Sequence, residues 1–245
     1  MNRPETLNAL SKGMFRELEA NLRNASKDRA VSSIVIKGEG RAFSAGLDVK
    51  EVSGFASRQE ARDFVYSLVK PFWKRFLESE KPILSMVDGP AYGAGAEIAL
   101  ASDIVAASTG STFAFSGARV GALCCISAAF GQFTMIGRKV IEMNLTGGSI
   151  SADEARSHGL VNYVEETSHL RERVDRLLNE IRSVSPISNA SFKRIHRSLL
   201  TTRALDIAHR ELFRTITSPD FVKGATAFKQ KTHPEYYQQS SPATG

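Results

Sequence analysis

Short apolar runs alternate with amphipathic stretches through the first two thirds of the chain. The runs at 33–37, 83–87, 104–107 and 160–164 are too short for typical helices, so each predicts a buried strand. Between them, apolar residues recur every three or four positions, as they do on one face of a helix. Strands therefore alternate with helices up to Val164, which predicts an α/β core.

Only helical patterns follow the last predicted strand. They cover residues 168–185, about 188–200, 203–217 and 219–230. The polar tail from His233 is expected to fray. This change of pattern divides the chain into an α/β core, residues 1–185, and a C-terminal helical segment, residues 186–245. Such a segment either caps its own core or packs on a neighbouring subunit.

Three core helices have local signals in the sequence. Asn8 is placed to cap the first helix. Apolar residues recur every four positions from Phe64 to Phe76, which predicts one long helix over 58–79 with a kink at Pro71. The spacing of Ser151 and Glu154 is that of a capping box, so a helix begins there.

The segment from Asp88 to Ala107 reads DGPAYGAGAEIALASDIVAA and joins two strands through a glycine turn and a helix. Gly93 and Gly95 flank Ala94, so the backbone there can lie close to a ligand. The helix begins with unpaired N–H groups at the positive end of its dipole. Such a place suits an anion, or an oxygen that becomes negative during a reaction. Glu97, in the first turn, is either a charge that stabilises the helix start or a catalytic base.

A second glycine-rich loop, GEGRAFSAGLD at 38–48, follows the first predicted strand. Loops at the ends of strands in α/β folds are common sites of ligand binding. The sequence therefore offers two loops that a ligand could occupy.

Composition narrows the choice of partners. The chain has 245 residues, 42% apolar and 24% charged, with a formal net charge of +6. This balance fits a nucleic acid, an anionic membrane surface or a phosphate-bearing small molecule. No basic run is interleaved with aromatic residues and no stretch is long enough for a membrane span, so the small molecule is favoured. Cys124 and Cys125 are adjacent, and neither the cysteines nor the histidines have a metal-binding spacing, which predicts reduced thiols, no metal site and a cytoplasmic protein.

Five stretches of the chain form an ordered set. They are NRPETLNAL at 2–10, RAFSAGLDVKE at 41–51, KPILSMVDGPAYGAGAEIALASDIVAAS at 81–108, IGRKVIEMNLTGGSISADEARSHGLVNYV at 136–164 and GATAFKQK at 224–231. Together they resemble the crotonase superfamily, the enoyl-CoA hydratase/isomerase family, over nearly the whole chain.

The resemblance implies a fold of stacked ββα turns with a C-terminal helical trimerisation segment, built as a homotrimer or a dimer of trimers. It implies acyl-CoA thioester substrates and no metal or redox cofactor, since coenzyme A is part of the substrate. Members of the family usually have a β-hairpin before the NRP motif. Here the motif begins at residue 2, so that hairpin is expected to be missing. In a eukaryote, the mitochondrial matrix would be an alternative to the cytoplasm.

The resemblance also implies roles for residues in both loops. By motif position, the backbone N–H groups of Leu47 and Ala94 bind the thioester oxygen and stabilise an enolate. Glu97 falls where hydratases of the family have one of two catalytic glutamates. The neighbouring residues expected to contact the substrate are Ala45, Gly46, Gly93 and Gly95.

The second glutamate is absent from the sequence. Its motif position holds Gly117, and no Asp or Glu occurs between Thr109 and Lys139. The usual Pro-Gly of this loop is replaced by Cys124 and Cys125, and Cys125 stands where some relatives have an acid. Three interpretations stay open: a hydratase-like enzyme with Glu97 as its acid and base, a decarboxylase or thioesterase, and a degenerate acyl-CoA-binding or assembly protein without turnover.

Other candidates concern the two ends of the substrate. The resemblance places Arg41, Phe228 and Lys231 near the coenzyme A moiety, where basic residues would suit its phosphates. The apolar stripe of the long helix and the aromatic residues after position 112 could line an acyl pocket, or could belong to the core. These residues are Phe64, Leu68, Phe72, Phe113 and Phe115.

Overall fold

The apolar runs form two small sheets in a computed structural model that describes residues 1–198 and 202–236. One sheet has four parallel strands in the order β1-β2-β4-β7, and the other has the order β3-β5-β6. In the second sheet β5 pairs parallel with β3 and antiparallel with β6. The strands are β1 Ile34–Lys37, β2 Ile83–Val87, β3 Ala91–Tyr92, β4 Ile104–Ser108, β5 Thr112–Ala114, β6 Ser149–Ser151 and β7 Tyr163–Glu165.

Two successive ββα turns form the centre of the core. In the first, β2 and β3 lead into α5 (Ala94–Ala101), and in the second, β4 and β5 lead into α6 (Cys125–Phe130). The first strand of each turn joins the four-stranded sheet and the second strand joins the other sheet. The expected stacked ββα fold is therefore confirmed. All eight residues of α5 are buried, which its small and apolar side chains allow.

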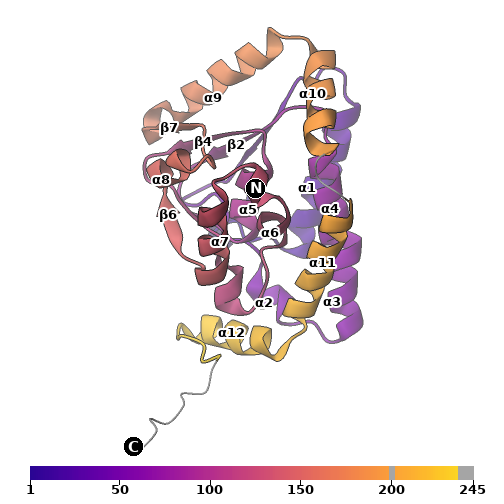
Figure 1. Ribbon diagram of the computed structural model, residues 1–245, viewed down its shortest axis with the longest axis vertical. Coiled ribbons are helices and arrows are strands. Elements are labelled where there is room, and N and C mark those ends of the chain that lie inside the picture. The colour runs from indigo at the N-terminus through magenta and orange to yellow at the C-terminus, as the bar shows by residue number, and fades with distance from the viewer. Residues whose placement is uncertain (199–201, 237–245) are drawn as a thin grey trace, which may run out of the picture.

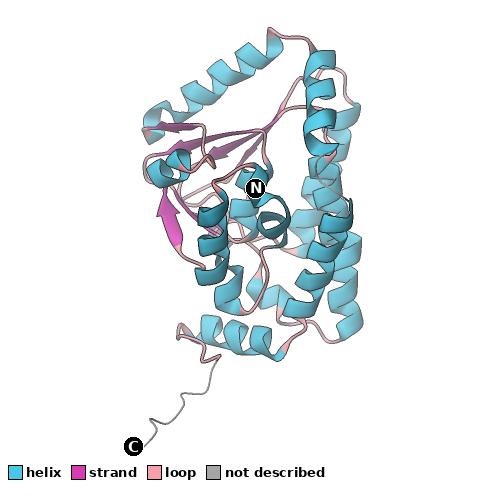
Figure 2. Cartoon of the chain, viewed as in Figure 1, coloured by secondary structure: helices cyan, strands magenta, loops and turns pink. Residues whose placement is uncertain are grey.

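Long helices cover one side of this core. Figure 1 shows the strands on the left with α8 and α9 beside them, α1, α3, α4, α10 and α11 on the right, and α5 to α7 between them. Figure 2 shows the same view with helices and strands in different colours. The remaining helices are α1 Lys12–Lys27, α2 Val49–Val52, α3 Arg58–Phe64, α4 Lys70–Leu77, α7 Gly137–Thr146, α8 Ala152–Ser157, α9 Thr167–Arg182, α10 Pro186–Ser198, α11 Thr202–Ile216 and α12 Pro219–Gln230.

The prediction that Asn8 caps the first helix is wrong. The cap of α1 is Ser11, whose Oγ accepts a hydrogen bond from the Met14 N–H. The Asn8 side chain is buried instead, where its amide donates to the carbonyls of Glu39 and Ala42, each at 2.8 Å. An Asn side chain can cap a helix or join distant backbone segments, and the local sequence does not distinguish the two uses.

The long helix predicted over 58–79 is divided into three parts. Between α3 and α4 lies a π-helical turn, η2 (Val65–Val69), and α4 has Pro71 in its first turn. Because Pro71 has no N–H, the regular hydrogen-bond pattern cannot continue through it, and the wider turn lies immediately before it. The capping box at Ser151 and Glu154 is confirmed, with both reciprocal bonds present.

Other differences concern short elements. β3 and β6 were not predicted, because strands of two or three residues have no visible period. The stretch after β5, predicted as a loop, contains a 3₁₀ turn, η3 (Ser116–Val120), and the first residues of α6. The end of the helix predicted over 188–200 and most of the predicted tail lie outside the described residues.

Candidate active site

A cavity of about 1060 Å³ opens between the N-terminal segment, the loops after β1 and β5, and helices of the covering layer. Most of the predicted site residues line it. These are Arg41, Ala45, Leu47, Gly93, Ala94, Glu97, Gly117, Cys125 and Phe228. Three predicted residues do not line it: Gly46, Gly95 and Lys231.

Gly46 and Gly95 instead allow the two glycine loops to touch. The Tyr92 N–H donates to the Ser44 carbonyl at 2.8 Å, and the Ser44 N–H donates to the Pro90 carbonyl at 3.2 Å, so the loops run side by side. A Cβ atom on Gly46, whose φ is +90°, would lie 2.7 Å from the Tyr92 carbonyl oxygen. One on Gly95 would lie 2.6 Å from the Ser44 carbonyl oxygen. Both positions therefore require glycine.

This contact brings two unpaired N–H groups onto one cavity. Neither the Leu47 N–H nor the Ala94 N–H donates to an acceptor within the described parts of the chain. The nitrogen of Ala94, the first residue of α5, lies 3.2 Å from the position that a Cβ on Gly46 would take, and Gly46 precedes Leu47. Two neighbouring donors of this kind suit one oxygen atom that carries negative charge.

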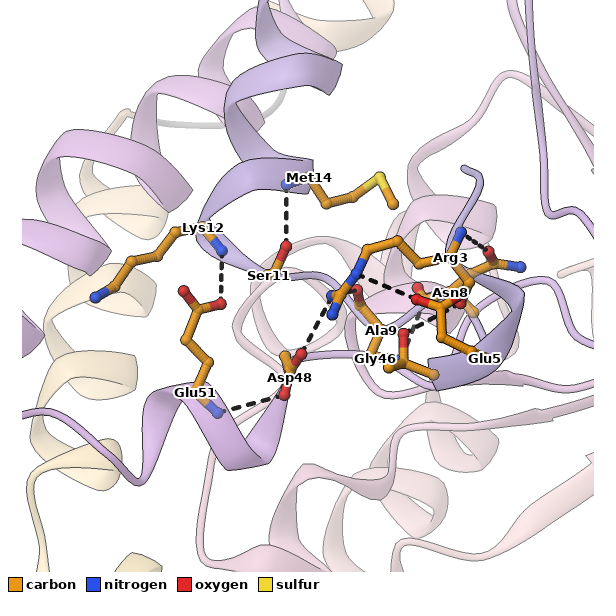
Figure 3. Close-up of polar contacts among 12 residues, drawn as sticks. Arg3, Glu5, Asn8, Ala9, Ser11, Lys12, Met14, Gly46, Asp48 and Glu51 are labelled. Atoms are coloured by element: carbon orange, nitrogen blue, oxygen red, sulfur yellow. Dashed lines mark hydrogen bonds and ion pairs between the residues drawn. The ribbon is translucent and has the colours of Figure 1, made fainter.

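The N-terminal segment holds the Leu47 loop in place, as Figure 3 shows. Arg3 donates from Nη1 to the Ala9 carbonyl at 3.0 Å and to Asp48 Oδ2 at 3.1 Å. The Leu10 N–H donates to the Gly46 carbonyl at 2.7 Å, and the Asp48 N–H donates to the Leu10 carbonyl at 3.1 Å. Residues 3–10 thus bracket the donor Leu47 on both sides.

Arg3 is a site residue that the sequence reasoning missed. It lines the cavity and pairs with a residue 45 positions away, and no local pattern announces such a contact. Asp48 Oδ1 also accepts from the Glu51 N–H at 3.3 Å and so caps α2. Asp48 thus holds its loop.

Glu97 is the buried carboxylate of the cavity, with 3% of its surface exposed. Its Oε1 accepts hydrogen bonds from the N–H groups of Ile126 at 2.6 Å and Ser127 at 3.0 Å, both in the first turn of α6. Burial raises the pKa of Glu97 to about 8, although the two hydrogen bonds act in the opposite direction. Its Oε2 has no hydrogen-bond partner in the described residues. Glu97 is therefore mostly protonated at neutral pH and can give or take a proton on the cavity side.

Gly117 also lines the cavity, and the chain is folded tightly around it. A Cβ atom there would lie 3.0 Å from the Ala122 carbonyl oxygen, 3.0 Å from the Cys124 nitrogen and 3.1 Å from the Cys124 Sγ. Cys124 and Cys125 are buried free thiols on the cavity wall. Burial, together with the nearby charge of Glu97, raises the pKa of both thiols well above the usual range, which keeps them neutral. Cys125 is therefore a poor acid.

Of the three residues predicted to lie near coenzyme A, two line the cavity and one does not. Arg41 is exposed at the edge of the cavity, and Phe228 reaches it from α12 with 54% of its surface exposed. Lys231 lies just beyond α12, with a left-handed backbone, and stays outside the cavity. Arg119, which the sequence reasoning did not single out, lines the cavity from η3.

The predicted acyl-pocket residues belong to the core. Phe64, Phe72, Phe113 and Phe115 are fully buried, Leu68 packs against the same core, and none of them lines the cavity. The apolar wall comes instead from other positions on neighbouring helical turns. Its residues are Phe15 of α1, Val52 of α2, Val69 of η2, Trp73 of α4 and Leu212 of α11.

Two features are absent from the described residues as a whole. None of their helices is long and apolar enough to cross a membrane. Residues 1–198 and 202–236 also contain no group of three or more His, Cys, Asp or Glu side chains that could hold a metal ion.

Comparison with known proteins agrees with the geometry. The sequence model of a family described as Enoyl-CoA hydratase/isomerase matches residues 1–239. The chain is 32% identical to a probable enoyl-CoA hydratase of Rhizobium meliloti, covering 96% of this chain and 92% of that protein. It is 33% identical to the rat mitochondrial enoyl-CoA hydratase domain-containing protein 3, covering 96% of this chain and 79% of that protein.

Solved structures give the same result. An enoyl-CoA hydratase of Mycobacterium avium subsp. paratuberculosis superposes with a TM-score of 0.82 at 28% identity, covering 97% of this chain and 93% of the other. An enoyl-CoA hydratase/isomerase of Pseudoalteromonas atlantica superposes with a TM-score of 0.84 at 26% identity, covering 97% and 94%. The fold, the family match and these relatives show together that the chain belongs to the enoyl-CoA hydratase/isomerase family of the crotonase superfamily.

Proposed function

We propose that this chain acts on acyl-CoA thioesters through an enolate, with Glu97, the one buried carboxylate among the described residues, as its acid and base. The N–H groups of Leu47 and Ala94 hold the thioester oxygen, and Glu97 transfers the proton at the adjacent carbon. The observation that supports this most is the position of Glu97, a buried carboxylate on the same cavity as two unpaired N–H donors. Preorganised donors of this kind typically lower a barrier by about 3–4 kcal/mol each.

A site with one working carboxylate favours proton transfer at carbon over addition of water. The tight backbone around Gly117 leaves no room for a second carboxylate without local movement. Three other carboxylates line the cavity: Glu5, Asp48 and Glu51. The Glu5 side chain is exposed and lies 3.9 Å from Arg3 Nε, Asp48 is paired with Arg3, and Glu51 Oε2 accepts from the Lys12 N–H at 2.8 Å. Asp48 and Glu51 are occupied in holding the loop.

Decarboxylation of a malonyl-type thioester is a second candidate, favoured by the protonation state of Glu97. In that reaction the bond to the carboxylate breaks, carbon dioxide leaves and the electron pair forms the enolate. No base is needed, but the enolate must then receive a proton at carbon. A carboxylic acid with a pKa of about 8 holds that proton at neutral pH.

Deuterium exchange tests the shared step directly. Butyryl-CoA is incubated with the protein in heavy water, and deuterium at the carbon next to the thioester is followed by mass spectrometry. We expect exchange with the wild type and a loss of about 10²-fold or more in Glu97→Gln. Glu172→Gln, an exposed carboxylate on α9, is the matched control and should exchange normally. Exchange that survives in Glu97→Gln would refute the role of Glu97.

Parallel incubations with other thioesters distinguish the possible functions. Hydration of crotonyl-CoA that depends on Glu97 would show that one carboxylate suffices for addition of water. Release of carbon dioxide from methylmalonyl-CoA would establish the decarboxylase, and release of free coenzyme A from butyryl-CoA would establish the thioesterase. Binding of all these thioesters with neither exchange nor turnover would leave an acyl-CoA binder and refute the enzymatic proposal.

We also propose that the chain assembles as a homotrimer or a dimer of trimers through its C-terminal helices. On α10, the large apolar side chains of Ile187, Phe192 and Ile195 are exposed to solvent, while Lys193 and Arg197 point inward and bind Asp103. Exposed apolar side chains gathered on one helix are typical of an interaction surface, and the occupant we propose is a second copy of the chain. Light scattering should give a trimer or hexamer for the wild type, and Phe192→Asp with Ile195→Asp should give smaller species. A monomeric wild type would contradict this proposal.

A further inference from the structure

Trp73 has an unusual place on the cavity wall. It lines the cavity, yet only 1% of its surface is exposed, and its indole N–H has no acceptor in the described parts of the chain. The polar side-chain atoms that are both unpaired and sealed from solvent in those parts belong to His158, Arg197 and His209. The indole nitrogen is not among them, so the small surface that Trp73 retains includes its N–H.

The elements packed on or near α4 contribute apolar side chains to the cavity. Phe15, Val69 and Leu212 line it from α1, η2 and α11, and these elements pack on one another or on α4. By contrast, the Tyr92 hydroxyl on the cavity wall is 3.1 Å from Thr112 Oγ1 and so has a partner. An N–H that reaches the cavity and has no partner in the described parts of the chain can donate to an acceptor of a bound ligand.

We infer that the preferred substrate has an uncharged oxygen on its acyl chain, beyond the thioester, that accepts a hydrogen bond from Trp73. This inference rests on the proposed acyl-CoA function and adds the class of acyl group. An indole N–H can only donate, so the partner must be an acceptor. A carboxylate would lose more hydration than a ketone against the apolar side chains of this wall, which disfavours it. A ketone satisfies both conditions, because it accepts and brings no donor of its own.

The test is a binding comparison that requires no turnover. The probes are octanoyl-CoA and its saturated monoketo derivatives, with the ketone at each successive carbon beyond the β-carbon. Affinities are measured by calorimetry on the wild type and Trp73→Phe, which keeps an aromatic ring and removes the N–H. One ketone should bind the wild type about fivefold more tightly than octanoyl-CoA, as expected for one added hydrogen bond. Trp73→Phe should lose that preference, so that the ketone and octanoyl-CoA bind the variant with equal affinity.

Fluorescence provides a second readout that needs no variant. Trp73 is the only tryptophan of the chain, so the intrinsic tryptophan emission reports on this residue alone. The preferred ketone should shift that emission to longer wavelength, because a hydrogen bond to the N–H stabilises the polar excited state, whereas octanoyl-CoA should not. Val69→Ala is the matched control: it changes the same wall without a polar atom and should weaken ketone and octanoyl-CoA equally.

The inference is overturned if every ketone binds the wild type no better than octanoyl-CoA, or if Trp73→Phe keeps the preference. It is also overturned if Trp73→Phe weakens binding of free coenzyme A, since the N–H would then serve the pantetheine arm. Failure of the proposed function has a different signature, namely deuterium exchange that does not depend on Glu97. The two failures are therefore distinguishable.

Discussion

Replacing Gly46 with alanine tests the geometry of the two donor loops. The new Cβ would lie 2.7 Å from the Tyr92 carbonyl oxygen and 3.2 Å from the Ala94 nitrogen, whereas ordinary contacts begin near 3.4 Å. The loops must therefore separate by an amount on the order of half an ångström or more. The backbone of Gly46 also has φ +90°, in a region that costs a residue with a Cβ about 1–2 kcal/mol.

The expected loss of activity follows from which atoms move. Gly46 precedes Leu47 and touches the residues around Ala94, so separation of the loops moves one donor away from the other. Loss of one such donor typically costs about 10²–10³-fold in kcat. We expect Gly46→Ala to exchange deuterium into butyryl-CoA about 10²-fold more slowly than the wild type, with a modest fall in melting temperature.

Gly137→Ala is the matched control. Gly137 is the first residue of α7, no atom lies within 4 Å of its added Cβ and its φ is not positive, so activity and stability should remain near wild type. Circular dichroism and thermal melting would show that Gly46→Ala is still folded. Exchange by folded Gly46→Ala within a factor of a few of the wild type would refute the assignment of Leu47 and Ala94 as paired donors.

Four further predictions concern Glu97, Gly117 and Arg3. If Glu97 acts as the base, the rate of deuterium exchange should rise with pH to a plateau above pH about 8. The rate of decarboxylation, which uses the protonated acid, should fall above that pH. A pH profile without a transition near 8 would contradict both expectations. Folding raises the pKa of Glu97 from 4.5 to about 8, so between these pH values the folded chain keeps a proton that the unfolded chain has lost. The free energy of unfolding should therefore fall as pH rises from 4.5 to about 8. Denaturant titrations of Glu97→Gln should show no such fall. Gly117→Glu should lower stability by about 1–3 kcal/mol through crowding against Cys124 and should not gain hydration of crotonyl-CoA; a stable, active hydratase would show that the loop yields easily. Arg3→Ala should slow deuterium exchange about tenfold, because it releases Asp48, and Arg3→Lys should restore part of the rate. An unchanged rate in Arg3→Ala would show that the other hydrogen bonds of residues 3–10 suffice to hold the Leu47 loop.

The sequence reasoning found what was encoded locally. Glu97, Leu47 and Ala94 stand in glycine-rich segments whose order along the chain is itself a signal, and the structure brings all three to one cavity. Contacts between distant segments could not be found in this way. Arg3 reaches Asp48 across 45 positions, and its sequence neighbours give no sign of that contact.

The apolar wall of the cavity shows the same limit of prediction from sequence. The predicted stripe includes Phe64 and Phe72. The residues that line the cavity instead, Val69 and Trp73, belong to the same helical stretch, and all four are hydrophobic. Phe72 and Trp73 are adjacent on α4 and both are buried, yet Trp73 lines the cavity and Phe72 does not. Periodicity identifies a buried face, but it cannot tell which buried residues border empty space.

The two ββα turns at the centre of the fold divide one chemical task between them. The start of α5 presents the unpaired Ala94 N–H to the cavity, while the start of α6 uses its N–H groups on Glu97 Oε1. Helix starts favour negative charge, so α6 alone would hold Glu97 ionised. Burial outweighs that effect and raises its pKa to about 8. The same arrangement that fixes the carboxyl group against α6 thus leaves its other oxygen close to the balance point between giving and taking a proton, as an enolate reaction with a single acid–base group requires.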